Sequence, residues 1–398
     1  MSSEHSASKR PLAQVAFYNN PRVRSVTYQL VLCAAVAFLV YGAADNAITN
    51  LERAHIASGF GFWNDTAGFD ISQTLIEYSP RASTYGRAFW VGLCNTLLVA
   101  GLGIIFATIL GFIIGISRLS RNWLLAKAAG GYVETIRNIP LLLQLLFWYN
   151  AVLKALPDIR DSIVVPGGAF LNNRGLYLPL PVTGAGFGWV EAALAVGVIA
   201  ASVFYLWARA RQMHTGAQAP VLAVSLAFVI GLPLAVFVAA GLPLHFEFPQ
   251  AGRFNISGGI EILPELAALL FGLSIYTAAF IAEVVRAGIL AVSGGQTEAA
   301  YSLGLKPGPT LRLIVVPQAM RVIIPPLTSQ YLNLTKNSSL AVAIGYPDLV
   351  QVFTGTVLNQ TGQAVEVVAI TMLVYLLISL ATSLIMNLYN SRMSLVER

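Results

Sequence analysis

Eight long runs of apolar residues limit the folds open to this 398-residue chain more than any other feature of its sequence. The runs occupy residues 26–44, 88–117, 129–154, 189–208, 219–241, 264–290, 318–343 and 365–389. Each has roughly the 20 residues that an α-helix needs to cross a bilayer. Charged residues make up only 11% of the chain, against about 25% in soluble proteins. The sequence therefore predicts an all-α polytopic membrane protein with about eight transmembrane helices.

The basic residues are distributed unevenly between the two sides of this predicted membrane. Of the 24 Lys and Arg residues, fourteen fall on the side of the termini, seven on the other side, and Arg137, Arg286 and Lys336 within apolar runs. Cytoplasmic loops carry the excess of Lys and Arg, so both termini are predicted to be cytoplasmic. The net charge of +6 then reflects membrane orientation, and no nucleic-acid partner is expected. The basic leader before the first run is long for a signal peptide, which favours an uncleaved first helix.

Two segments on the other side, residues 45–87 and 155–188, are rich in Gly, Pro, Asn and aromatic residues and show no long periodic pattern. Gly and Pro at this density mark turns and loops. We therefore expect both segments to be loops, with short interfacial helices at most.

A polar, turn-rich island at residues 294–317 separates two apolar runs. Thr297 is placed to cap a short helix, and Glu298 then lies in its first turn, where the positive end of the helix dipole favours an acid. Gly304 falls where such a helix ends in a left-handed residue. The spacing predicts a helix of about two turns.

A proline and glycine turn follows, and then a second short helix. Thr310 is placed to cap this helix, and Pro317 is expected to interrupt it. Ala299 and Ala300 are small enough to let another protein approach the first helix closely. The island is therefore predicted to be a two-helix elbow that docks onto a partner.

The island resembles the EAA signature of bacterial ATP-binding-cassette importer permeases. The residues that carry the resemblance are Glu298, Ala299, Ala300, Gly304, Val316 and Pro317. It implies a cytoplasmic loop that fits a groove of an ATPase subunit, with Glu298, Ala299, Ala300, Gly304 and Pro317 as the coupling residues. An ordinary capped loop is the alternative, and it explains the helix signals but not the whole pattern.

Polar residues within the apolar runs are the candidates for a transport path, because an ionisable group there costs roughly 2.5–3.5 kcal/mol on insertion scales. Glu134 and Arg137 are three residues apart and are expected to pair on one helix face. Pro140 is expected to kink that helix and free a carbonyl group. Gln144, four residues further on, is a candidate for the path, while a purely structural pair at the helix end remains an open alternative.

The run that leads into the island carries a second candidate group. Thr277 lies on one helical stripe, whereas Glu283 and Arg286 can pair on another. We expect Thr277 and Glu283 to border the path, with Arg286 in a structural or gating pair. A pair that only stabilises a hinge is an equally open interpretation.

A third polar group interrupts the run at 318–343. Its members are consecutive: Lys336, Asn337, Ser338 and Ser339. The helix is expected to break here, and a polar break is tolerated in a membrane only where it lines a cavity or is buried by other helices. These four residues are therefore further candidates for the substrate path.

The order of these runs is similar to that of polar amino-acid importer permeases of the histidine/glutamine/arginine group, over about residues 88–155 and 264–390. The enlarged form resembles the Q-type permeases of general L-amino acid transport systems. On this basis the chain divides into residues 1–87, a first core part at 88–155, an insertion with two extra helices at 156–263, and a second core part at 264–398. The resemblance implies an importer of L-amino acids, glutamate and glutamine among them, in a bacterial inner membrane. It also implies three kinds of partner: a second permease subunit, an ATPase dimer and a periplasmic substrate-binding protein.

The sequence contains no Gly-x-x-x-x-Gly-Lys-Ser/Thr motif, so we expect ATP and Mg²⁺ to bind the partner ATPase and no cofactor to bind this chain. Its four histidines form no metal-ligand pattern, and no metal site is expected. Neither do the residues form the cluster of acids or histidines that a membrane enzyme needs. A secondary transporter or a channel for a small polar solute remains the alternative, because polar breaks in helices suit it equally.

Overall fold

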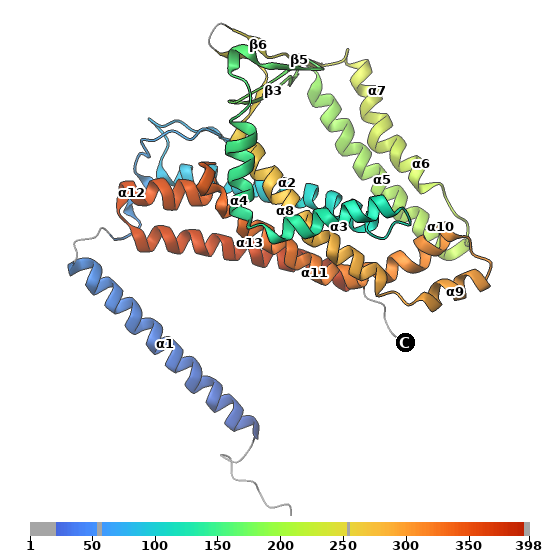
Figure 1. Ribbon diagram of the computed structural model, residues 1–398, viewed down its shortest axis with the longest axis horizontal. Helices are drawn as coiled ribbons and strands as arrows, with labels where there is room; N and C mark the ends of the chain where they lie inside the picture. Colours follow the sequence, from blue (N-terminus) through green and yellow to red (C-terminus); the bar gives the residue numbers. More distant parts are fainter. Residues whose placement is uncertain (1–20, 54–57, 253–254, 394–398) are drawn as a thin grey trace, which may run out of the picture.

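The computed structural model describes residues 21–53, 58–252 and 255–393 (Figure 1). The long helices are α1 (Pro21–Arg53), α2 (Tyr85–Ser117), α3 (Trp123–Asn138), α5 (Phe187–Thr215), α8 (Pro264–Leu290), α11 (Val316–Asn337) and α13 (Ala364–Met393). The short ones are α4 (Leu141–Leu146), α6 (Val221–Leu226), α7 (Leu232–Ala239), α9 (Gly294–Ser302), α10 (Pro307–Thr310) and α12 (Leu358–Thr361). Stretches of 3₁₀ or π geometry are η2 (Gly61–Asn64), η3 (Phe147–Leu153), η4 (Ile159–Asp161), η5 (Ala227–Gly231), η6 (Leu311–Val315), η7 (Ser338–Ile344) and η8 (Val350–Val357).

The predicted membrane spans are confirmed. Within the described residues, seven helical segments are long and apolar enough to cross a membrane, and there are eight if the bent pair of α3 with α4 and η3 counts as one span. Helix α8 covers the same residues as the predicted run 264–290. The span predicted at 318–343 begins earlier, at Pro307, because the chain stays helical through the second half of the polar island.

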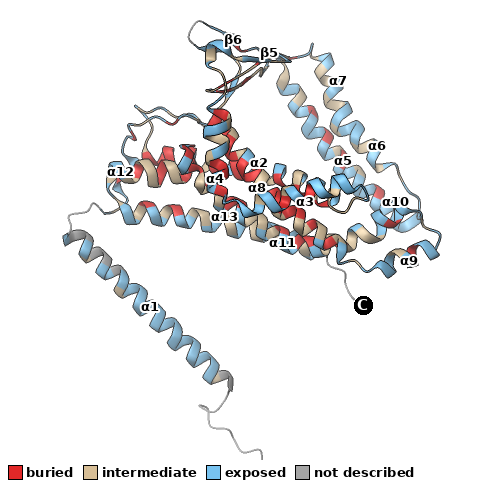
Figure 2. Cartoon of the chain, viewed as in Figure 1, coloured by how far each residue is buried: buried red, intermediate tan, exposed pale blue. Residues whose placement is uncertain are grey.

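Helices α2 and α8 form the centre of the molecule, where buried residues concentrate (Figure 2). Glycines on α2 allow the close approach, because a Cβ at Gly111 would lie 2.6 Å from the Cβ of Ile281. Gly115 lies in the same way against Ala282 and Val285. Small residues at such positions let helix backbones pack closely in membranes. Gly115 follows Gly111 on α2, and its partner Val285 follows Ile281 on α8, so the two helices run in the same direction.

Helix α1 stands apart from the other helices in Figure 1. None of the apolar window in its span, Val23–Ala43, is buried within the described chain. Figure 2 colours most of α1 as exposed, so this span is left to contact lipid or another chain.

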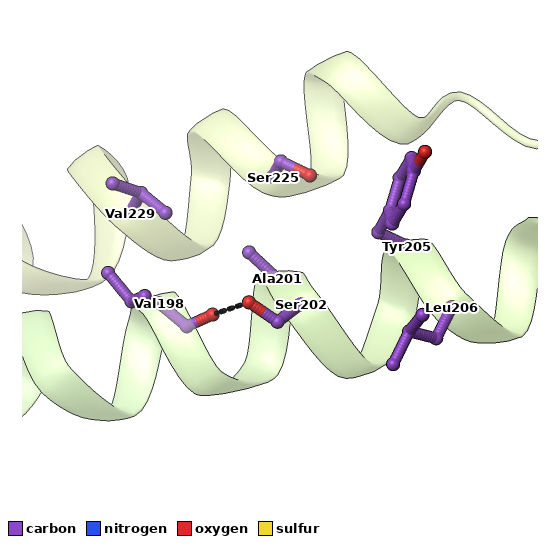
Figure 3. Close-up of a pocket in the computed structure, with 7 residues that line it drawn as sticks. All are labelled: Val198, Ala201, Ser202, Tyr205, Leu206, Ser225 and Val229. Carbon is purple, nitrogen blue, oxygen red and sulfur yellow. Dashed lines mark hydrogen bonds between the residues drawn. The ribbon is translucent and has the colours of Figure 1, made fainter. Parts of the chain in front are cut away.

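The inserted pair of spans forms a helical hairpin, α5 against α6, η5 and α7, that projects from the centre (Figure 1). A Cβ at Gly197 of α5 would lie 2.2 Å from the carbonyl oxygen of Phe228, so glycine is required for this contact. A hollow of about 400 Å³ opens further along the pair (Figure 3). Its walls are mainly apolar, and the Ser202 hydroxyl donates to the carbonyl of Val198 in its own helix at 2.8 Å. The hollow therefore offers little to a polar solute.

The expectation that residues 155–188 form only loops and interfacial helices is wrong, because this segment and the chain before α8 build antiparallel β-structure. A four-stranded sheet has the order β1-β2-β3-β8, with β1 (Ile163–Val165), β2 (Ala169–Asn172), β3 (Gly175–Leu178) and β8 (Ile260–Ile262). Two further pairs join β4 (Leu180–Thr183) to β5 (Leu244–Glu247) and β6 (Gln250–Ala251) to β7 (Ile256–Ser257). Partner strands come from both ends of the hairpin, which ties the insertion to the outer end of α8. In the described part of residues 45–87, α1 continues to Arg53, α2 begins at Tyr85, and residues 58–84 are loop with the short helix η2.

Candidate functional site

A sharp bend follows α3, as the proline there predicts. The segment of α4 and η3 departs from α3 at 104°, and Pro140, which cannot donate a backbone hydrogen bond, sits at the turn. The side chain of Gln144 is buried, and its Nε2 donates to the carbonyl oxygens of Ile136 and Ile139, both at 2.9 Å. Gln144 therefore satisfies carbonyls that the bend leaves without helical partners, which is a structural role.

A small polar pocket of about 110 Å³ lies between α8 and α11. Helix α8 contributes the side chains of Tyr276, Thr277 and Phe280, and α11 contributes Gln330, Asn333 and Asn337. The three residues of α11 follow the i, i+3, i+7 spacing that places side chains on one helix face. The lining residues carry two hydroxyls, of Tyr276 and Thr277, and three carboxamide groups beside two aromatic rings, so the pocket can both donate and accept hydrogen bonds.

A positive charge contacts one of the aromatic residues that line this pocket. The guanidinium carbon of Arg137 is 4.9 Å from the centre of the Phe280 ring, a distance typical of a cation–π contact. The predicted pairing of Arg137 with Glu134 is therefore wrong: among the described residues the ion pairs are formed elsewhere, and Glu134 is exposed. An exposed ion pair contributes little, whereas the ring offers the arginine a favourable contact on α8.

The consecutive polar residues of α11 separate into different environments. The expected break is only a change of helix type: the α-helix ends at Asn337 and the same span continues as the 3₁₀ segment η7. The hydroxyls of Ser338 and Ser339 donate to the carbonyls of Thr335 and Lys336, and Lys336 itself is exposed. Among the described residues, Asn337 is the one of the four predicted here that lines the pocket.

Glu283 lies below the pocket, in an ionic triad instead of the pocket wall. It accepts hydrogen bonds from Arg118, which directly follows α2, and from Arg286, whose Nη2 is 2.6 Å away. The pairing of Glu283 with Arg286 was predicted, whereas the contribution of Arg118 was not. The triad ties the end of α2 to α8 close to the polar island.

The island forms the predicted elbow, with its first helix displaced. Helix α9 begins at Gly294, with Ser293 as its N-cap residue, so the predictions that Thr297 caps it and that Glu298 lies in its first turn are wrong. Its end is as predicted: Gly304 has a φ of 77°. The amide of Leu305 donates to the carbonyl of Ala300, which closes a Schellman motif.

The second half of the elbow is continuous with the next span. Helix α10 begins at Pro307, and the Thr310 hydroxyl donates to the Lys306 carbonyl, so Thr310 is not its cap. Pro317 does not interrupt the helix either, because it lies in the first turn of α11, where a missing amide proton costs least, directly after the π segment η6. The elbow exposes Leu303, which is 82% accessible, although Ala300 beside it is buried.

A buried polar cluster lies at the other end of α2, and none of its residues was predicted to line the substrate path. The Asn95 amide donates to the carbonyls of Gln73 and Pro347, and the Thr96 hydroxyl accepts from the amide of Leu349. Asp348 is fully buried and accepts from the Tyr375 hydroxyl of α13 at 3.1 Å. These bonds fix the turn after η7 against α2, which positions the end of α11 that bears Asn337.

Together, the membrane spans, the polar pocket between two helices and the elbow that joins those helices define the membrane subunit of a transport system. Residues 219–395 match the family described as "Binding-protein-dependent transport system inner membrane component". The chain belongs to this family.

Relatives cover nearly its whole length. It is 53% identical to the "General L-amino acid transport system permease protein AapQ" of Rhizobium johnstonii, over 95% of this chain and 94% of that protein. It is 51% identical to the "Putative amino-acid ABC transporter permease protein YhdX" of Escherichia coli, over 96% of this chain and 97% of the relative. The "Glutamate/glutamine/aspartate/asparagine transport system permease protein BztB" of Rhodobacter capsulatus is 44% identical, with 95% of each chain covered.

Proposed function

We propose that this chain is the permease subunit of an ATP-driven, binding-protein-dependent importer of L-amino acids, including polar ones of the glutamate and glutamine type. The observation that carries the proposal is its similarity, over 95% or more of its length, to three proteins named as amino-acid permeases. A similarity this complete includes both walls of the pocket and the elbow.

The pocket chemistry supports an amino-acid substrate. A zwitterion presents both hydrogen-bond donors and acceptors, which the hydroxyl of Thr277 and the amides of Asn333 and Asn337 can match. Arg137, in contact with the Phe280 ring, adds a positive field that favours a carboxylate. We assign Gln144, Glu283, Lys336, Ser338 and Ser339 supporting positions around the path, in line with their contacts.

The connection of the elbow to the pocket supports a coupling role for α9 and α10. Helix α8 carries Thr277 at the pocket and is joined to α9 by a turn of residues 291–293, while α10 continues through η6 into α11, which carries Asn337. Any displacement of the elbow therefore moves both pocket walls. From residue 277 to residue 290, α8 spans about 20 Å at 1.5 Å per residue. A rigid helix can transmit a movement of one end to the other over this distance. Alternating access then follows from movement of the elbow by a partner.

The partners in this proposal are an ATPase dimer, a second permease chain and a periplasmic binding protein. The sequence lacks a phosphate-binding loop, so ATP and Mg²⁺ are assigned to the ATPase, which docks on the elbow at Glu298, Ala299, Ala300, Gly304 and Pro317. The exposed side chain of Leu303 supports docking, because an apolar residue on an otherwise polar turn gains from being covered. A secondary transporter is the alternative, and it needs no ATPase.

The orientation in this proposal places both termini and the elbow in the cytoplasm of a bacterium, with the sheet outside. Ser302 and Asp161 are both exposed. In a background without Cys33 and Cys94, a cysteine at Asp161 is expected to react with an impermeant thiol reagent in intact cells, whereas one at Ser302 reacts only after lysis. Labelling of the Ser302→Cys variant but not of the Asp161 variant in intact cells would show that the orientation is the opposite of the proposed one.

The substitution Thr277→Val tests the pocket, because it replaces a hydroxyl with a methyl group of similar size. Loss of one hydrogen bond costs about 1.4 kcal/mol, which is about tenfold in affinity. The apparent affinity for imported amino acids is expected to fall by about that factor, with the amount of assembled complex unchanged. Thr328→Val on α11 is the matched control, because its hydroxyl donates to Ile324 in its own helix. Unchanged uptake of every amino acid by Thr277→Val would show that the pocket is not part of the substrate path.

A further inference from the structure

An apolar groove of about 790 Å³ lies below the four-stranded sheet, between α2, η3 and α8. Its walls include Ile109 of α2, Leu153 of η3 and Ala267 and Phe271 of α8. Phe271 and Ile109 are about half exposed, so the groove is open at the side. Along α8 it reaches from Pro264 to Ile275, about 16 Å at 1.5 Å per residue, which is roughly half of a 30 Å hydrocarbon core.

The sheet forms a roof over the end of this groove. Leu171, Leu176 and Ile262 line the groove and are directly paired across β2, β3 and β8. Residues paired in this way lie on the same face of a sheet. The sheet therefore turns an apolar face toward the membrane at the end of the spans, where headgroups meet hydrocarbon.

A basic pocket of about 660 Å³ adjoins the groove at this level. It is lined by Lys154, Asp158, Arg160, Asn173 and Arg174 among others, three cations against one carboxylate. Neighbouring residues of the same two chain segments line both hollows. In the first segment, residues 152 and 153 line the groove and residue 154 lines the basic pocket. In the second, residues 172 and 175 line the groove, and residues 173 and 174 between them line the basic pocket. The basic pocket therefore lies where the groove reaches the membrane surface.

Contacts fix the Lys154 side chain and the backbone at Arg174 before any ligand binds. The Lys154 ammonium lies 4.3 Å from the centre of the Tyr149 ring, and the Tyr149 hydroxyl donates to Glu265 at 2.7 Å. The amide of Arg174 donates to the Asn172 side chain, which is fully buried. Among the described residues, the ion pairs involve neither Lys154 nor Arg174. Both charges thus remain available to an anion.

We propose that the groove and the basic pocket together bind one anionic phospholipid from the leaflet on the sheet side, with an acyl chain along α8 and the phosphate near Lys154 and Arg174. An acidic protein surface would match the cations but leave the groove empty. A zwitterionic lipid would fill the groove but gain less from the net positive charge. The inference rests on the membrane fold and does not depend on which solute is transported.

Native mass spectrometry of the full-length chain in detergent, titrated with phosphatidylglycerol or phosphatidylcholine, tests the headgroup site. Wild type is expected to prefer phosphatidylglycerol. A cation near an anionic lipid surface contributes about 1 kcal/mol, or about fivefold, so Lys154→Ala with Arg174→Ala is expected to weaken phosphatidylglycerol binding about 25-fold. Arg81→Ala with Arg87→Ala, which removes two cations from the segment before and at the start of α2, is the matched control and should retain the preference. Equal affinity of wild type for the two lipids would overturn the proposal.

The groove is tested by filling it and by labelling it. Ala267→Trp is expected to reduce binding of both lipids, whereas Ala195→Trp on the exposed face of α5 is not. A photoreactive benzoylphenylalanine at Phe271, in the chain assembled with its natural partners in membranes, is expected to form a phospholipid adduct. An adduct with a protein chain instead would show that the groove is a subunit contact, and unchanged lipid binding in Ala267→Trp would also contradict the proposal.

Discussion

Replacing Gly111 with leucine is expected to reduce the folded chain recovered from membranes to less than a tenth of wild type. The new Cβ would lie 2.6 Å from the Cβ and Cγ2 of Ile281 and 3.1 Å from the carbonyl oxygen of Ala278. A backbone carbonyl cannot rotate away as a side chain does, so α2 and α8 must separate. Overpacking of a tight core costs about 3 kcal/mol at the upper end of its usual range, and here it affects the central helix pair.

Gly101→Leu is the matched control for this experiment. It lies on the same helix and adds the same side chain, but no described atom lies within 4 Å of a Cβ at this position. Fluorescence-detected size-exclusion chromatography of tagged chains measures the recovered monodisperse fraction. Equal recovery of Gly111→Leu and Gly101→Leu would contradict the packing described for α2 and α8.

The second large effect is expected at the elbow, where Gly304→Leu should uncouple transport while leaving the chain in the membrane. A left-handed conformation costs a residue other than glycine about 1–2 kcal/mol, and Gly304 has a φ of 77°. No described atom lies within 4 Å of its Cβ position, so the effect arises from backbone strain that distorts the Schellman motif. Uptake is expected to fall at least about tenfold relative to ATP hydrolysis.

Gly294→Ala serves as the control for the elbow, because it adds a methyl group at the start of α9, where the backbone is helical and the described surroundings are open. Uptake and ATP hydrolysis are measured on the same reconstituted samples. Fully coupled transport by Gly304→Leu would show that the shape of the elbow does not transmit force.

The spans could be predicted from the sequence because their signal is local and long. About 20 apolar residues in one run have few alternatives to a membrane helix, and α8 occupies the predicted residues. The bend at Pro140 also followed from one residue, since proline removes a backbone donor. The start of α9 could not be predicted in this way, because Ser293 and Thr297 are both acceptable capping residues and propensity alone does not choose between them.

The β-structure could not be predicted, because its strands have two to four residues and two of the strand pairs join segments on either side of the inserted hairpin. Strand β3, for example, pairs with β8, and some 80 residues lie between them. Short segments of this kind carry too little periodicity to be recognised, and their partners are fixed by tertiary structure. The Glu134 and Arg137 pair failed for a related reason: spacing on one helix cannot reveal the Phe280 ring on another.

For the pocket, the sequence indicated Thr277 and Asn337 as candidates for the substrate path, and both line the pocket; Gln330 and Asn333, which also line it, were not indicated. The signal for these two was present, because residues 330, 333 and 337 share a helix face. Arg118 and Asp348 were missed because their partners lie on other helices, on α8 and α13 respectively. Polar residues thus mark a site in the sequence, but their partners depend on how the helices pack.

Uptake by proteoliposomes that contain this chain with the partner permease and ATPase tests the central claim most directly. Labelled glutamate or glutamine is supplied with the binding protein outside, and ATP is trapped inside. The proposal predicts accumulation that requires both ATP hydrolysis and the binding protein, and that is unaffected when proton and sodium gradients are abolished. Accumulation by this chain alone, driven by an ion gradient without ATP, would contradict it and favour a secondary transporter.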